Sequence, residues 1–142
     1  MAKRPKRPAK IWVYSPKKPP KPKIPPALKA EAEARANALV ETVFKPEALK
    51  PPLENPQFNY ITDIHTTWFR GYLYFCAIYA SPFPDAISPT FEVRFTRLEY
   101  AGGDRFHLAY MRHTGQWWQL FSDLTLDEAM ETIEKTPHFH IM

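Results

Sequence analysis

Six side chains in this sequence have the chemistry of general acids and bases: Asp63, His65, Glu92, Glu99, His107 and His113. Acid–base catalysis needs such groups paired with one another beside a substrate. Asp63 and His65 are the best placed, because alternate residues of a strand share a face and the carboxylate could orient the imidazole. Such pairs are also ordinary on solvated sheets. We therefore interpret them as a solvated pair, expect a non-enzymatic protein with no catalytic residue, and keep an enzyme centred on His65 as a third hypothesis.

Metal ligands are sparse and poorly spaced in the sequence. His107 and His113 are six residues apart, which is roughly 20 Å along a strand and too far for one ion. His138 and His140 form an HxH pair, but the sequence names no third ligand. Cys76 is the single cysteine, and we interpret it as a small core residue because no basic residue near it in sequence could stabilise a thiolate. Since phosphate-binding glycine loops and nucleophile elbows are also absent from the sequence, we predict no metal site and no cofactor.

Positive charge is concentrated at the start of the sequence. Residues 1–28 hold nine Lys and Arg and no Asp or Glu, hence +9, whereas the remainder holds ten basic and fifteen acidic residues, hence −5, for a net charge of +4. Eight of the sixteen prolines fall in the same segment, which excludes a helix and favours an extended, polyproline-like form. The basic pI of about 9.2 therefore belongs to an arm and not to the globular body.

Three uses of this arm are compatible with its sequence. Its apolar patch, residues 11–14, could pack against the arm's own domain. Its lysines and arginines could neutralise the phosphates of a nucleic acid or of an RNA-containing particle. Its PxxP motifs, residues 16–19 and 19–22, could bind a protein that recognises proline-rich segments. The residues that we assign to nucleic-acid binding, two of them from the body, are Lys3, Arg4, Lys6, Arg7, Lys10, Trp12, Lys17, Lys18, Lys21, Lys23, Arg112 and Trp117.

The body begins with a helical pattern over residues 27–44. Pro25 and Pro26 suit a first helical turn, where a missing amide hydrogen costs nothing. Apolar residues then recur at helical spacing, and the charged residues fall largely outside this stripe. We expect Pro46 to end the helix and a proline-rich connector to follow up to Pro56.

Five strand-like runs follow the connector. The first two span residues 58–80 with Arg70-Gly71 as their turn, and the second run is apolar on both faces, which predicts a buried strand. The other three form a β-meander over residues 91–120 with two glycine-bearing turns. The alternation slips between Arg97 and Leu98, which predicts a β-bulge there.

A short helix is predicted at the end of the chain. Thr125 and Glu128 have the spacing of a capping box, and Pro137 is expected to end the helix. We expect residues 138–142 to fray or to form a last edge segment. With two helices available to cover one face of the sheet, the other face could be left open for a partner or for a second copy of the chain.

Aromatic and arginine side chains gather near two of the predicted turns, over residues 68–72 and 110–118. Aromatic platforms edged with arginine hold single-stranded nucleic acid in sheet-based modules, and the same composition also fits a core. Trp117 and Trp118 are adjacent in a predicted strand, so they must point to opposite faces. At least one of them therefore faces a covering helix or the solvent.

The run RLEYAGGDRFHLAYMRHTGQWWQL, residues 97–120, together with the Leu-Asp-Glu helix that follows, resembles the C-terminal half of a family of small, uncharacterised bacterial proteins of unknown function. In that family a basic-plus-Tyr strand, an aromatic-Arg strand and a Trp-bearing strand succeed one another. The likeness covers about a third of the chain. It implies a β-meander followed by a helix, and it implies no particular chemistry.

We predict an α+β protein, with an N-terminal helix, a five-stranded antiparallel β-meander and a short C-terminal helix in one domain of residues 27–142, preceded by a basic, proline-rich extended arm of residues 1–26. We expect the arm to engage nucleic acid or another anionic partner. The alternative is a homo-oligomer or protein adaptor in which the arm crosses a subunit interface. No run approaches the roughly 20 apolar residues of a membrane span, and the basic start lacks the apolar segment of a signal peptide, so we expect a cytoplasmic protein with no membrane partner.

Overall fold

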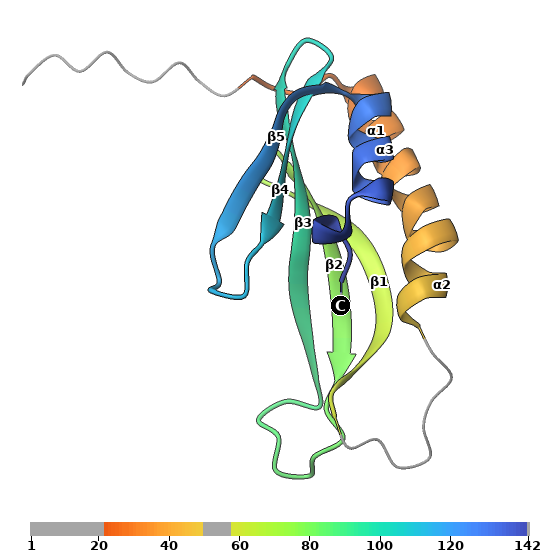
Figure 1. The fold of residues 1–142 in the computed structure, drawn as a ribbon, viewed down its shortest axis with the longest axis vertical. Helices are drawn as coiled ribbons and strands as arrows, with labels where there is room; N and C mark the ends of the chain where they lie inside the picture. The colour runs from red at the N-terminus through yellow and green to blue at the C-terminus, as the bar shows by residue number, and fades with distance from the viewer. Residues whose placement is uncertain (1–21, 50–57, 142) are drawn as a thin grey trace, which may run out of the picture.

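The structure is a computed structural model that describes residues 22–49 and 58–141. Its centre is one antiparallel sheet in which strands follow each other in sequence order, β1-β2-β3-β4-β5 (Figure 1). The strands are β1 (Tyr60–Phe69), β2 (Tyr72–Ala80), β3 (Thr90–Gly102), β4 (Arg105–Met111) and β5 (Trp117–Thr125). The predicted α+β fold class and five-stranded meander are confirmed.

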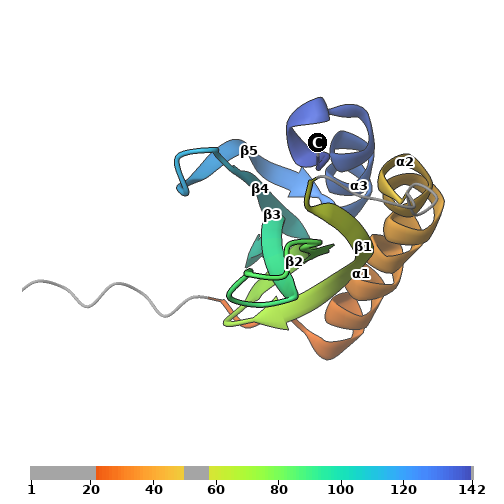
Figure 2. The same ribbon diagram turned by 90° about the horizontal axis from the view of Figure 1, so that it is seen from below.

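The helices of the described chain lie together on one side of this sheet, as the two views in Figures 1 and 2 show. They are α1 (Pro26–Leu39), a π-helical turn η1 (Val40–Phe44), α2 (Lys45–Ala48), α3 (Leu126–Lys135) and a 3-10 turn η2 (Pro137–Phe139). Ala32 and Ala36 of α1 are fully buried, and small side chains of this kind let a helix lie close to the layer beneath it. The core between helices and sheet also contains Val40, Phe44, Ile64, Leu73, Phe75, Leu98, Phe106, Leu108, Ile133 and Phe139.

The first helical segment does not end at Pro46 as predicted, because η1 and α2 carry it on to Ala48. In η1 the Lys45 N–H donates to the Val40 carbonyl, five residues earlier, which is the wide turn of a π-helix. Pro46 then falls in the first turn of α2, where its lack of an N–H is tolerated. The residues 50–57 of the predicted connector lie outside the described chain.

The predicted turn between the first two strands is confirmed. Phe69 pairs with Tyr72, so Arg70 and Gly71 alone connect β1 to β2. Both have positive φ, 51° and 82°, which is the geometry of a two-residue hairpin turn with the right-handed twist of its strands. The buried second strand is also confirmed, since Leu73 to Ala77 are almost fully shielded from solvent.

The β-bulge in β3 lies at Phe95, so its predicted place between Arg97 and Leu98 was wrong. Phe75 pairs with Thr96 and Cys76 pairs with Arg94, which leaves Phe95 as the extra residue. Phe95 and Thr96 are both buried, at 6% and 0% exposure. The alternation therefore changes phase at Phe95, because a bulge places two residues opposite one.

The end of the described chain is anchored in the core, and the predicted frayed or edge segment was wrong. Phe139 is fully buried, and the Thr96 hydroxyl donates a 2.9 Å hydrogen bond to its carbonyl. These contacts join residues 43 apart in sequence, which is why a local pattern could not reveal them. The predicted capping box of α3 is confirmed, with Thr125 and Glu128 bonded in both directions.

Candidate functional site

The face of the sheet away from the helices carries a patch that we call the arginine–aromatic surface, made of Phe69, Arg70, Tyr72, Tyr74, Arg94, Arg97 and Trp117. In β2, Leu73 and Phe75 belong to the core beneath the helices. Side chains alternate along a strand, so Tyr72 and Tyr74 point to the opposite face. The arginines of β3 and Trp117 of β5 lie against these two rings.

The guanidinium groups of this surface lie over aromatic rings. Arg94 is 4.4 Å from the ring centroid of Tyr74 and 5.3 Å from that of Phe69. Arg97 is 4.7 Å from the Tyr72 ring and 5.0 Å from the Trp117 ring. Arg70 is 5.0 Å from the centroid of the Phe69 ring, which Arg94 also contacts. All are within the roughly 6 Å of a cation–π interaction, and the ring contacts of Tyr74 with Tyr72 and Trp117 join the two groups into one stack.

None of the arginines in this stack forms an ion pair with a carboxylate of the described chain. The ion pairs of the described chain involve other residues. Arg97 also has a buried Nε with no hydrogen-bond acceptor among the described residues. A guanidinium that lies over a ring can still donate paired N–H groups to the oxygens of a phosphate or carboxylate. The stack is therefore a set of positioned cations that form no ion pair within the described chain.

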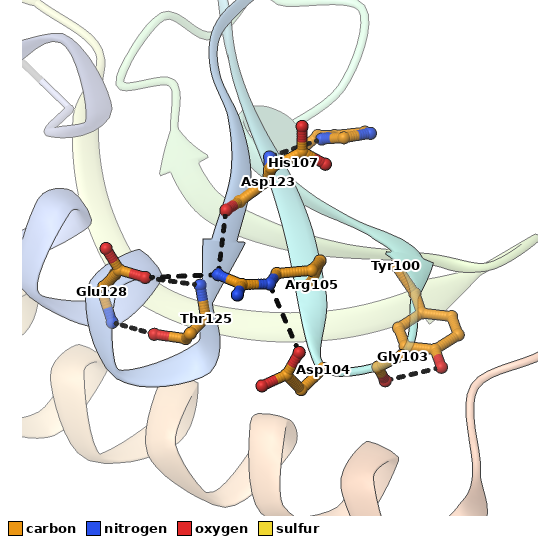
Figure 3. Close-up of polar contacts among 8 residues, drawn as sticks. All are labelled: Tyr100, Gly103, Asp104, Arg105, His107, Asp123, Thr125 and Glu128. Atoms are coloured by element: carbon orange, nitrogen blue, oxygen red, sulfur yellow. Dashed lines mark hydrogen bonds and ion pairs between the residues drawn. The ribbon is translucent and has the colours of Figure 1, made fainter.

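Arg105 shows the opposite arrangement (Figure 3). Its Nε lies 3.4 Å from Asp104 Oδ1, and its Nη1 lies 3.7 Å from Glu128 Oε1. The same Nη1 donates to the Asp123 carbonyl at 3.4 Å. Arg105 is thus compensated by two carboxylates, which makes it a matched internal control for the arginines of the stack.

The arginine–aromatic surface has an accessible edge and a buried floor. Phe69 is 47% exposed, whereas Tyr74 is 7% exposed. Arg94, Arg97 and Trp117 are half-buried between them. A flat ligand could therefore meet the Phe69 ring while charged groups of the same ligand met the arginines.

The two body residues predicted to bind nucleic acid lie on different sides of the β4–β5 hairpin. Trp117 belongs to the arginine–aromatic surface. Arg112 instead lies 4.7 Å from the Trp118 ring. Trp118 pairs with Tyr110, and Tyr110 packs against η2 on the helix side. Arg112 and Trp117 are thus not parts of one site.

Nine of the predicted arm residues, eight basic residues and Trp12, lie in the segment 1–21 outside the described chain: Lys3, Arg4, Lys6, Arg7, Lys10, Trp12, Lys17, Lys18 and Lys21. Lys23 is described and exposed. The described chain begins beside the β3–β4 turn, since a side-chain carbon at Gly102 would lie 3.7 Å from Pro22. This is the end of the sheet that carries Arg70, because Tyr72 pairs with Glu99 near the end of β3.

His65 has a different carboxylate partner from the one expected. Its Nε2 lies 2.5 Å from Glu92 Oε1. Asp63 instead accepts a 2.9 Å hydrogen bond from the Ile64 N–H and lies 3.4 Å from Lys45 Nζ. The ligand atoms of His65, Cys76 and Glu92 all lie within 4.8 Å of one another. The structure therefore brings together three residues from β1, β2 and β3 that lie far apart in the sequence.

Cys76 is fully buried. Burial raises the pKa of its thiol to about 12, and the Glu92 carboxylate adds to this rise, while Arg94 acts in the other direction. The residue is therefore a neutral thiol near neutral pH, which fits the expectation that it is not an activated nucleophile.

The remaining histidines are tied into local structure. His107 Nδ1 accepts a 3.1 Å hydrogen bond from the Asp123 N–H. His140 contacts Glu47 at 2.8 Å and the carbonyls of Ile133 and Glu134. His138 contacts Tyr110 with tilted rings, 5.1 Å between their centroids. The HxH pair is thus divided between separate surroundings.

Arg94 and Arg97 were missed because their spacing hides their relationship. Residues three apart in a regular strand point to opposite faces. The bulge at Phe95 changes the phase between them, so both reach the ring-bearing face. The slip in alternation does indicate a bulge in this strand. The predicted position, between Arg97 and Leu98, lies after both arginines and so does not place them on one face.

In the described part of the chain, no helix has the length and apolar character needed to cross a bilayer. Comparisons with curated proteins and with solved structures found no match. A family model described as a domain of unknown function, DUF3024, matches residues 23–141. The match includes the first helix and all five strands, so the resemblance stated for the C-terminal third was too narrow. The chain belongs to the DUF3024 family.

Proposed function

We propose that this protein binds single-stranded nucleic acid on the arginine–aromatic surface, with the basic arm adding contacts to the phosphate backbone. The observation that carries the proposal is the stack of guanidinium groups over aromatic rings, without carboxylate partners among the described residues. Proteins that hold single strands combine cations for the phosphates with aromatic rings on which bases stack. Both components are present on one sheet face.

The two components would have different tasks. Phe69 has the ring most accessible to a base, and stacking of one base on an aromatic ring contributes about 1–3 kcal/mol. Arg94 and Arg97 would meet phosphates, since a guanidinium can donate two parallel hydrogen bonds to one phosphate group. Because every base has a stacking face, the surface would have little sequence preference.

The arm supports the same partner through its charge. Residues 1–28 hold nine basic and no acidic residues, and the described chain begins at the end of the sheet that carries Arg70. Each phosphate neutralised on a single strand releases counterions and adds roughly 0.7 to the slope of log affinity against log salt. Arm and surface together would therefore give a steep salt dependence.

The test measures binding of the full chain to fluorescein-labelled oligo(dT) and oligo(U) of about 15 nucleotides by fluorescence anisotropy, from about 50 to about 200 mM salt. We expect the double variant Arg94→Gln/Arg97→Gln to lose about tenfold or more in affinity. It should also lose roughly 0.7 of the salt slope per phosphate contact. Phe69→Ala should lose about tenfold with an unchanged slope, because stacking involves no counterion release.

Arg105→Gln is the matched control, since it removes the same charge from a compensated site. It should change the affinity by less than about twofold. An equal loss in Arg105→Gln and in the double variant would mean that only the net charge matters, and the proposed surface would be abandoned. Affinity that is independent of salt would overturn the proposal for the arm as well. Comparison of oligo(dT) with oligo(U) shows which nucleic acid is preferred.

A further inference from the structure

A second group of side chains with defined chemistry lies on the same face of the sheet, beyond the arginine–aromatic surface. His65 of β1 pairs directly with Cys76 of β2. Glu92 of β3 pairs with Ile78, two residues further along β2. The three side chains therefore meet across neighbouring strands, and their ligand atoms lie within 4.8 Å of one another.

The three donor atoms are an imidazole nitrogen, a sulfur and a carboxylate oxygen. Zinc binds these donors at about 2.0–2.3 Å in a tetrahedral arrangement, which places neighbouring donors roughly 3.3–3.8 Å apart. The ligand atoms of the three residues lie at most 4.8 Å apart, so small side-chain movements would bring them to this spacing. The close contact of 2.5 Å between His65 Nε2 and Glu92 Oε1 would have to open, by about 1 Å on the same geometry.

We propose that His65, Cys76 and Glu92 bind a divalent transition-metal ion of the zinc class. Sulfur and imidazole donors select such ions over magnesium and calcium, which prefer oxygen donors alone. The charges also match, since one thiolate and one carboxylate neutralise a divalent cation. The three residues come from a rigid antiparallel sheet, so the donors are fixed by the backbone register and not by a loop.

The site has a buried side and an accessible side. The Cys76 side chain is fully buried, whereas the side chains of His65 and Glu92 are 36% and 43% exposed. An ion held by all three would have the sulfur beneath it and would be reached by solvent from above. Three protein ligands leave a fourth tetrahedral position for water or for an added ligand.

A simpler role for the three residues is an ion pair of His65 with Glu92 over a space-filling thiol. The surroundings of Cys76 favour the metal site. A cysteine used only as a small apolar residue would face apolar atoms, but the sulfur here faces the imidazole and the carboxylate. The sulfur contacts the Tyr74 carbonyl at 3.9 Å, which is long even for sulfur, and it also forms a side-chain hydrogen bond with Glu92.

The test is a titration of the reduced, full-length protein with cobalt(II), followed by absorption spectroscopy. Cobalt bound to a thiolate has a sulfur-to-metal charge-transfer band in the near ultraviolet, and four-coordinate cobalt has strong ligand-field bands in the visible. Cys76 is the single cysteine of the chain, so a charge-transfer band can only come from this site. We expect saturation at one cobalt per chain and loss of the bands when zinc is added.

Variants separate the proposed site from adventitious binding. Cys76→Ser should abolish the charge-transfer band, and His65→Gln and Glu92→Gln should each weaken cobalt affinity about tenfold or more. His113→Gln and His138→Gln are the controls and should leave the titration unchanged. His65 and Glu92 are partly exposed, so their variants keep the test valid even if Cys76→Ser fails to fold. Absence of the band at about a hundredfold excess of cobalt, or an unchanged titration in His65→Gln and Glu92→Gln, would overturn the proposal.

Discussion

The two sides of the sheet differ in whether their arginines form ion pairs and in whether their apolar side chains are covered. Near the helices, Arg35 of α1 pairs with Asp127 of α3, and Arg105 at the start of β4 is compensated by Asp104 and by Glu128 of α3. Exposed ion pairs of this kind contribute only about 0–1 kcal/mol each, and the stability of this side comes from the buried apolar residues between helices and sheet. On the other side, Arg94 and its neighbours lie over aromatic rings that range from exposed Phe69 to buried Tyr74, and they form no ion pair within the described chain. We infer that the covered face stabilises the fold and the ring-bearing face binds a partner.

The largest effect that tests this difference is expected for Phe139→Ala. Phe139 is fully buried beneath the helix side of the sheet and lies 6.0 Å from the Phe121 ring. Removal of such a ring should lower the free energy of unfolding by about 3–5 kcal/mol, because it removes apolar burial and leaves a cavity. Urea unfolding followed by circular dichroism measures the change.

Phe69→Ala provides the comparison on the other face. Phe69 is 47% exposed, so this substitution should change the unfolding free energy by about 1 kcal/mol or less. Similar losses for Phe69→Ala and Phe139→Ala would show that the two faces contribute equally to stability, and the inferred division would be wrong.

A smaller effect is expected from a single buried hydrogen bond. The Thr96 hydroxyl is fully buried and donates to the Phe139 carbonyl at 2.9 Å. Thr96→Val keeps the shape of the side chain but leaves that carbonyl without its donor, which should cost about 1–3 kcal/mol. Thr67→Val, on the ring-bearing side of β1, is the control and should change stability by about 0.5 kcal/mol or less. If Thr96→Val lowers the free energy of unfolding no more than Thr67→Val does, the anchoring of the C-terminal segment does not depend on this hydrogen bond.

The smallest expected effect is a pH dependence on the helix side. The pKa of Glu128 lies below its usual range because the carboxylate accepts a hydrogen bond from the Thr125 backbone N–H. Since the folded pKa is the lower one, its contribution to stability is complete above the unfolded pKa of about 4.3. It is lost as pH falls through the folded pKa. The difference in unfolding free energy between wild type and Glu128→Gln should therefore shrink as the pH is lowered from about 5 to about 3.

Glu33→Gln, an exposed site on α1, is the control for this measurement and should show a smaller change over the same pH range. A difference for Glu128→Gln that stays constant down to low pH would mean that the capping carboxylate does not titrate with folding. In that case the capping box would stabilise α3 through the Thr125 side chain alone.

Much of the fold was predictable because it depends on neighbours in sequence. The hairpin at Arg70 and Gly71 and the capping box at Thr125 are local structures that two to four residues determine. Alternating apolar residues similarly predicted the strands. Two predictions about chain segments were wrong. The helical segment continues past Pro46, which follows a π-helical turn. Phe139 packs in a core formed by residues far from it in sequence.

Local sequence patterns were enough to predict the helices and strands and their order, and composition alone separates a basic segment from an acidic remainder. Which polar side chains meet depends on how the strands pair. The bulge at Phe95 brings Arg94 and Arg97 to one face, and the register of β1, β2 and β3 gives His65 the neighbours Cys76 and Glu92 in place of Asp63. This follows from the period of two in a strand. A one-residue change of phase moves every later side chain to the other face, so a local pattern can reveal strands without revealing which of their residues form a site.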